Sequence, residues 1–139
     1  MKYYLVNTNR KADPSGYDEN IMLKEEIVSL YFEHYKQRIN NLDVGDVVFL
    51  YSNGNGIIAY GEVCSETLVR DYRSNKSTDE EYYKKLKDFK KLHTPVTVQD
   101  ITDKLGKKMP VAKAIAEVNN EFASCILYLA NNHRLSLVS

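Results

Sequence analysis

The sequence predicts an α+β protein in which helices flank a mixed β-sheet that curls into a half-open barrel. Residues 47–65 carry the pattern of a β-hairpin, two apolar runs joined by a turn of asparagine and glycine. Other strand-like runs alternate with helical patterns of unequal length, and too few strand–helix–strand units occur for a doubly wound sheet. The 139 residues suffice for one core, so we expect one domain over residues 1–139.

The N-terminal half is expected to begin with a central strand, because aromatic and β-branched residues occupy both of its faces. The Asp-Pro-Ser-Gly run at residues 13–16 indicates a turn. Apolar residues at three- and four-residue steps between Val28 and Leu42 predict a helix. In order, the expected elements are a strand over residues 2–8, a loop over 9–19, a helix over 24–40, a turn over 42–46 and hairpin strands over 47–51 and 57–65.

The C-terminal half is more polar. The stripe of Tyr82, Tyr83, Leu86 and Phe89 within residues 71–91 predicts a second helix. After it we expect a strand over residues 94–101, a turn over 106–110, a short helix over 111–118 and a strand over 122–129, with residues 130–138 forming a last helix or a fraying tail.

Composition excludes several classes of protein. Nineteen basic and nineteen acidic residues give a net charge of zero, so no bulk positive field draws the chain to nucleic acid. No apolar run is long enough for a membrane span or a signal peptide, which predicts a cytosolic protein with no membrane partner. Cys64 and Cys125 are expected to be buried free thiols, with one disulfide as the alternative. The histidines lack neighbours at metal-ligand spacing, so no metal and no cofactor is predicted.

Catalytic motifs are also missing from the sequence. No phosphate-binding loop, dinucleotide fingerprint or nucleophile elbow occurs, and the Gly54-Asn55-Gly56 run is interpreted as a hairpin turn. Adjacent carboxylates such as Glu80 and Glu81 would diverge on a helix. The sequence therefore predicts a binding protein and not an enzyme.

Polar groups at the ends of apolar strands suggest a binding site. Eleven tyrosines combine apolar rings with polar tips, which suits stacking surfaces as well as core edges. Amides and hydroxyls beside such rings can read the edge of a base, or simply cap turns. The lysines within residues 84–91 are open to a similar choice between a phosphate contact and a solvated face.

Two segments carry a resemblance to a known family. Leu42-x-Val44-Gly45-Asp46 precedes the apolar strand that ends in Tyr51-Ser52-Asn53, and residues 56–63 read Gly-Ile-Ile-Ala-Tyr-Gly-Glu-Val. Together with the tyrosine-rich first strand, they resemble the PUA-like superfamily, and within it the EVE domains, relatives of the YTH readers of methylated RNA. The resemblance is carried by residues 1–65, and residues 95–129 match only as later strands of the barrel.

The resemblance implies a pocket for a flipped, often modified base. It places this pocket at the end of the first strand, on the following helix and on the strand after Gly45-Asp46. The implied nucleic-acid-binding residues are Asn7, Thr8, Asn9, Tyr31, Tyr35, Arg38, Tyr51, Ser52 and Asn53, with Phe32 beside Tyr31 on the helix. The sequence departs from the family pattern because it has no tryptophan, no Lys-Ser-Glu at residues 7–9 and no histidine after Tyr51.

Three functions follow in order of preference. The first is a module that binds DNA or RNA through one base, modified or unmodified, with a nuclease or another defence protein as the partner that the resemblance implies. The second is a protein-interaction or regulatory module that kept the fold and lost the pocket, which zero net charge and the missing tryptophan favour. The third is an enzyme acting on nucleotides.

Overall fold

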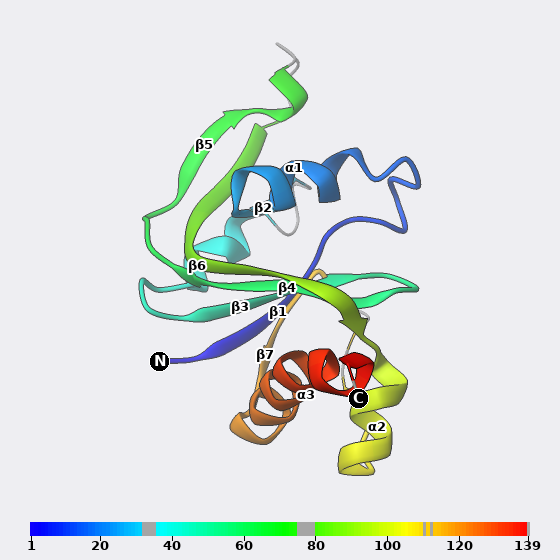
Figure 1. The fold of residues 1–139 in the computed structure, drawn as a ribbon. Coiled ribbons are helices and arrows are strands. Elements are labelled where there is room, and N and C mark those ends of the chain that lie inside the picture. The colour runs from blue at the N-terminus through cyan, green and yellow to red at the C-terminus, as the bar shows by residue number, and fades with distance from the viewer. Residues whose placement is uncertain (32–35, 75–79, 110, 112, 139) are drawn as a thin grey trace.

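The computed structural model describes residues 1–31, 36–74, 80–109, 111 and 113–138. Strands and helices interleave along the chain (Figure 1). The strands are β1 (Tyr3–Asn7), β2 (Ile27–Leu30), β3 (Val47–Ser52), β4 (Gly56–Val63), β5 (Leu68–Asp71), β6 (Glu80–Val96) and β7 (Ile115–Val118). The α-helices are α1 (Tyr17–Glu25), α2 (Val98–Leu105) and α3 (Asn120–Val138), and the short 3-10 helices are η1 (Lys36–Asn41) and η2 (Tyr72–Ser74).

The described strands form one mixed, curled sheet in the order β2-β6-β4-β3-β1-β7, with β5 also pairing with β6. β1 and β3 run parallel, and the other pairs are antiparallel. In Figure 1, α1 lies on one side of the central strands and α2 and α3 lie on the other. The predicted class, a mixed half-barrel sheet with flanking helices, is confirmed.

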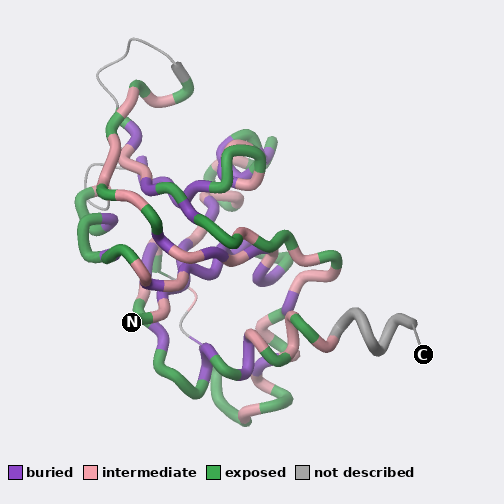
Figure 2. The backbone as a smooth tube through the Cα atoms, turned by 60° about the vertical axis from the view of Figure 1, so that its left-hand side comes forward, coloured by how far each residue is buried: buried purple, intermediate pink, exposed green. Residues whose placement is uncertain are grey.

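The side chains of the central strands alternate between the two faces of the sheet. Tyr4 and Val6 of β1 join a cluster with Met22 of α1, whereas Leu5 joins a cluster with Ile101 of α2 and Ile126 of α3. We call these the α1 face and the α3 face. The same division continues on β3, where Val48 and Leu50 lie on the α1 face and Phe49 and Tyr51 on the α3 face. Figure 2 shows the buried positions running along the sheet and the exposed positions gathering in the turns.

The first strand and the hairpin are confirmed. β3 and β4 pair antiparallel, with a register shift between Leu50 and Tyr51. Gly56 opens β4 at a φ of 114°, and a Cβ there would lie 2.4 Å from the carbonyl oxygen of Val96. Only glycine tolerates both the positive φ and the close approach of β6.

The helix predicted over residues 24–40 is wrong. Glu26 adopts a left-handed conformation and ends α1, and the next four residues form β2, antiparallel to β6. All four residues of β2 are buried, so the strand shows no polar face that would reveal its two-residue period. Residues 32–35 of the predicted helix lie outside the described residues, and Lys36–Asn41 form the 3-10 helix η1.

The helix predicted within residues 71–91 is also wrong. β6 runs through seventeen residues and pairs with β2 and β5 near its start and with β4 further on. Two inward positions of this strand are charged, Glu81 at 3% exposure and Lys84 at 6%. Lys84 donates to the carbonyl of Leu42. Charged residues at inward positions hide the strand pattern, because hydropathy alone assigns them to the surface.

Three C-terminal predictions exchange helix and strand. The strand predicted over residues 94–101 is the end of β6 followed by α2, which Thr97 and Asp100 begin with a capping box. The helix predicted over 111–118 is wrong, because Ile115–Val118 is β7 and pairs with β1. The strand predicted over 122–129 lies in α3, while the alternative of a helix over 130–138 is confirmed.

Both cysteines are free, as predicted, but Cys64 is exposed and only Cys125 is buried. The prediction that both thiols are buried is therefore wrong for Cys64. Among the described residues, no helix is both long and apolar enough to cross a membrane.

Candidate functional site

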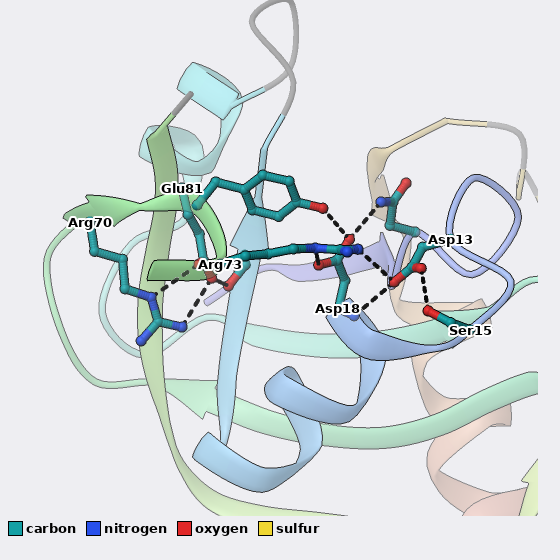
Figure 3. A network of polar contacts seen from close by, with 9 residues as sticks. Asp13, Ser15, Asp18, Arg70, Arg73 and Glu81 are labelled. Atoms are coloured by element: carbon teal, nitrogen blue, oxygen red, sulfur yellow. Dashed lines mark hydrogen bonds and ion pairs between the residues drawn. The ribbon is translucent and has the colours of Figure 1, made fainter. Parts of the chain in front are cut away.

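A hollow opens on the α1 side of the molecule, between α1, the end of β2, the β5–η2 segment and the start of β6 (Figure 3). It measures about 340 Å³ when its open mouth is included. Aromatic rings and charged groups line it together. The lining residues are Tyr17, Asp18, Ile21, Glu25, Tyr31, Arg70, Tyr72, Arg73 and Glu81. We call this hollow the tyrosine pocket.

Three tyrosines from separate segments supply the rings. Tyr17 begins α1 and is 44% exposed, whereas Tyr31 follows β2 and is 8% exposed. The rings of Tyr31 and Tyr72 lie 4.8 Å apart at 43°. Burial, together with the charges of Asp18 and Glu81, raises the pKa of the Tyr31 hydroxyl well above its ordinary value. The Tyr31 hydroxyl therefore stays neutral. The three rings offer flat apolar faces, with Tyr17 at the rim of the pocket and Tyr31 at its base.

Asp18 is the central polar group of the pocket. Its side chain is 2% exposed. Its Oδ2 accepts from Asn9 Nδ2 at 2.9 Å and from the Tyr72 hydroxyl at 2.7 Å, and its Oδ1 accepts from Arg73 Nε at 3.3 Å. Burial and then the hydrogen bond to Asp18 raise the pKa of Tyr72. A carboxylate this deeply buried is stable only while several donors face it.

Arg73 lies across the pocket. Its guanidinium stands 4.6 Å from the Tyr17 ring centroid and 5.1 Å from that of Tyr72, and its Nη2 is 3.0 Å from Asp13 Oδ2. Desolvation lowers the pKa of Arg73, but the hydrogen bond and attraction to Asp18 outweigh it and raise the pKa. The side chain is 38% exposed, so one edge remains in solvent. Its backbone is left-handed, at φ 57°.

A second arginine closes the opposite wall. Arg70 Nε and Nη2 contact the two oxygens of Glu81 at 3.0 and 3.1 Å, and Nη1 contacts Glu25 at 2.8 Å. Ser29 donates to the same Glu81 carboxylate at 2.6 Å. The Arg70 guanidinium also packs on Tyr83 at 4.5 Å. This paired arrangement fixes the wall in one geometry, because a bidentate pair is directional.

The turn predicted at residues 13–16 sets the position of Asp18. Asp13 accepts from the Asp18 amide at 2.9 Å and from the Ser15 hydroxyl at 2.7 Å. These bonds, the first of them above all, lower the pKa of Asp13. Gly16 stands at φ 77° immediately before α1, and the next two residues, Tyr17 and Asp18, line the pocket. Figure 3 shows Asp18 directed toward Arg73. The helix therefore begins inside the segment that the sequence indicated as a loop.

Of the residues that the resemblance implied, Asn9 and Tyr31 meet at the tyrosine pocket, Tyr31 as a wall and Asn9 as a donor to Asp18. Thr8 lies behind them, fully buried, and donates to Glu19 at 2.7 Å. Glu19 in turn contacts Arg10 at 3.4 Å. These residues gather where β1 ends beside α1.

The other implied residues lie elsewhere. Asn7 donates to the carbonyls of Val111 and Lys113, which ties the chain before β7 to β1. Tyr51 is 6% exposed and packs on the α3 face, so it does not reach the ring of Tyr31. The remaining positions are dispersed. Ser52 is buried and accepts from Asn55, whereas Asn53 is exposed in the β3–β4 turn. Arg38 lines an open hollow with Lys2, Asn40 and Lys113, and Tyr35 lies outside the described residues.

Sequence reasoning missed Tyr17, Asp18, Tyr72 and Arg73. Tyr17 and Asp18 follow the Pro-Ser-Gly turn directly, a position at which a helix commonly begins. That signal was available but was assigned to a loop. Tyr72 and Arg73 are separated from α1 by about fifty residues of sequence, and no local pattern places them beside it. Among the described residues, no group of histidine, cysteine and carboxylate side chains could hold a metal ion.

The chain was compared with known proteins. The YTH domain of MmI1 superposes with a TM-score of 0.66 at 11% identity over 98% of this chain and 99% of that chain. A complex of the YTH domain-containing protein mmi1 with RNA gives a TM-score of 0.65 at 10% identity over 99% and 85%. The ASCH protein from Zymomonas mobilis gives 0.61 at 11% identity over 92% and 95%. These likenesses establish the fold.

The sequence itself identifies the family. No curated protein sequence matches the chain. The family model described as the EVE domain, however, matches residues 2–129, which includes every element from β1 to most of α3. The resemblance first carried by residues 1–65 thus extends over nearly the whole fold. The chain belongs to the EVE domain family.

Proposed function

We propose that this protein is a nucleic-acid-binding module that receives one base in the tyrosine pocket. The observation that carries the proposal is the meeting of the Tyr17, Tyr31 and Tyr72 rings around the buried Asp18 carboxylate. Aromatic rings stack on unpaired bases, and a carboxylate accepts from an exocyclic amino group. Membership of the EVE family and the likeness to a protein solved with RNA support the same function.

The proposed function is binding without catalysis. The buried carboxylates Asp18 and Glu81 are each held by an arginine and by hydroxyl donors. This arrangement suits orientation of a ligand better than proton transfer, which needs a group free to change its protonation state. Recognition of a modified base and a nuclease or defence-protein partner stay predictions from the resemblance, and a cytoplasmic location stays a prediction from the apolar pattern of the sequence.

A protein-interaction module is the second candidate. Two observations favour it: the net charge of zero, and the Arg73 side chain that lies across the pocket. A module of that kind would keep the fold while its own arginine filled the pocket permanently. The two candidates differ in whether an oligonucleotide reaches the tyrosines.

Fluorescence anisotropy with short single- and double-stranded DNA and RNA separates them. Each probe is tested unmodified and with 5-methylcytosine, 5-hydroxymethylcytosine or N6-methyladenine. If the proposal holds, at least one probe binds, and Tyr17→Ala weakens it by the loss of one stacking contact, roughly 1 to 3 kcal/mol. Tyr128→Ala is the matched control, since Tyr128 is a 51% exposed helical tyrosine with Lys104 over its ring, in α3.

Unchanged binding by Tyr17→Ala would place the nucleic-acid surface away from the pocket. No binding of any probe by the wild type at low salt would favour the protein-interaction module. Equal losses in Tyr17→Ala and Tyr128→Ala would indicate a general effect of removing a surface ring.

A further inference from the structure

We infer that the Arg73 guanidinium occupies the place of the ligand, and that the ligand which displaces it is a nucleobase carrying an exocyclic amino group. This inference rests on the proposed function and deepens it. The starting point is the position of Arg73, which lies beside the rings of Tyr17 and Tyr72 and beside the carboxylates of Asp13 and Asp18. Figure 3 shows the two carboxylates around its guanidinium.

The guanidinium shares two features with an amino-substituted base, a flat face and N–H donors along its edge. It is flat, so it packs against the rings of Tyr17 and Tyr72, and its N–H groups lie in the plane of the group, directed at Asp18 and Asp13. Adenine, cytosine and guanine share these two properties, a face that stacks and an edge that donates. Uracil and thymine have carbonyl oxygens on either side of their ring N–H, and these oxygens would face the carboxylate.

Asp18 sets the donor requirement. Its carboxylate is 2% exposed, and its Oδ2 accepts from Asn9 and Tyr72, two bonds that do not involve the Arg73 side chain. When Arg73 leaves, the Oδ1 atom loses the hydrogen bond from Nε. A buried carboxylate oxygen that loses a donor is destabilised until another donor replaces it. A ligand that enters this position must therefore bring an N–H group without a carbonyl oxygen on each side of it, which an exocyclic amino group does and the ring N–H of uracil does not.

Arg73 is held less firmly than Arg70, although both are about one-third exposed. Arg70 makes a bidentate contact with Glu81 and a further contact with Glu25, at 2.8–3.1 Å. Arg73 has one longer hydrogen bond to Asp18 at 3.3 Å and a single ion pair with Asp13 at 3.0 Å, and no bidentate contact with one carboxylate is among those described. Its left-handed φ of 57° is unfavourable for a residue with a Cβ and persists only while surrounding contacts hold it.

The test removes the Arg73 guanidinium by mutation and supplies free methylguanidinium in solution. Arg73→Ala leaves a space that methylguanidinium should enter, so the melting temperature of the variant should rise saturably with methylguanidinium concentration. Wild type should show no such rise. Arg10→Ala is the matched control, because Arg10 is 35% exposed and contacts Glu19, but its guanidinium contacts no pocket ring among the contacts described.

The base is tested with free nucleosides, which carry no phosphate for Arg73 to contact. By calorimetry, adenosine or cytidine should bind Arg73→Ala roughly tenfold more tightly than wild type, since the arginine no longer competes. Uridine should bind neither, and methylguanidinium should compete with the bound nucleoside. If Arg73→Ala does not fold, Arg73→Lys keeps a charge near Asp18 without the flat group and should show the same order of nucleosides with a smaller gain.

Three outcomes would overturn the inference. A folded Arg73→Ala that ignores methylguanidinium would show that the pocket does not recognise a flat donor-bearing group. Uridine binding as well as adenosine and cytidine would remove the donor requirement. Methylguanidinium binding without any nucleoside binding would point to an arginine side chain of a partner protein. Oligonucleotide binding by wild type that is sensitive to Tyr17→Ala would leave the proposed function standing in each case.

Discussion

The two faces of the central sheet use the same strands for different purposes. On the α3 face, Phe49 packs between Tyr3 and Tyr60, and the rings and aliphatic groups of α2 and α3 complete an apolar cluster. On the α1 face, an apolar cluster is bordered by buried polar groups, among them Thr8, Asp18, Glu19, Ser29 and Glu81. Buried charges add little net stability, whereas apolar packing adds much. The α1 face therefore combines an apolar cluster at least as large as that of the α3 face with buried polar groups, and the proposed function places recognition there.

The largest effect is expected from Phe49→Ala. Phe49 is fully buried at the centre of the α3 face, and its truncation leaves a cavity beside Tyr3 and Tyr60. The free energy of unfolding should fall by roughly 3 to 5 kcal/mol, measured by urea denaturation. Below its melting temperature the variant should still bind the oligonucleotide found for wild type. A selective loss of binding in the folded variant would contradict the division between the faces.

Asp18→Asn should produce a smaller loss of stability and a larger loss of binding. The amide keeps the size of the carboxylate but turns one acceptor into a donor that opposes Asn9 Nδ2, the Tyr72 hydroxyl or Arg73 Nε. We expect the free energy of unfolding to fall by about 1 to 3 kcal/mol. Urea denaturation and anisotropy measure the two effects on one preparation. Wild-type binding by this variant would show that Asp18 serves only the fold.

Thr97→Ala should lower the free energy of unfolding by about 1 kcal/mol, since it removes the hydroxyl that accepts from the Asp100 amide at the start of α2. Thr102→Ala, in the middle of the same helix, is the control. Oligonucleotide affinity should not change in either variant, because α2 lies on the α3 face. A change in oligonucleotide affinity for Thr97→Ala but not for Thr102→Ala would show that the start of α2 on the α3 face influences binding on the α1 face.

The smallest effect is a dependence on pH. The pKa of Asp13 in the folded protein lies below its ordinary value of 3.8, so the ionised carboxylate stabilises the fold above that pH. This contribution is lost as the pH falls through the lower, folded-state pKa. Asp13→Asn should therefore show a weaker fall in melting temperature than wild type at pH values below about 4. Identical acid profiles would mean that the turn at residues 13–16 does not depend on this charge.

Local patterns predicted some elements well and others badly, for identifiable reasons. β1 and the β3–β4 hairpin were predictable because apolar runs end at residues suited to turns, and Gly56 reports the close approach of β6. β2 was not predictable, because all of its residues are buried and no alternation is visible. β6 was not predictable either, because charged residues occupy inward positions of this strand. α2 could have been found from its Thr97–Asp100 capping box.

The same distinction applies to the pocket. The family resemblance implied Asn9 and Tyr31, both near the end of β1 in the fold, and it also implied Tyr51. The alternation of β3 turns Tyr51 to the α3 face, and its 6% exposure removes it from the pocket. A one-residue change of register decides on which face a side chain lies, and sequence alone does not report it.

By itself the sequence determined the fold class and membership of the EVE family. It also determined β1, β3 and β4, because each is an apolar run that ends at turn residues. Only the tertiary structure decided that Tyr17 and Asp18 meet Tyr72 and Arg73, and that Glu81 is buried beside Arg70. The physical reason is that turn signals and apolar periodicity act between near neighbours in the chain. A buried charge is stable only with partners that folding brings from far along it.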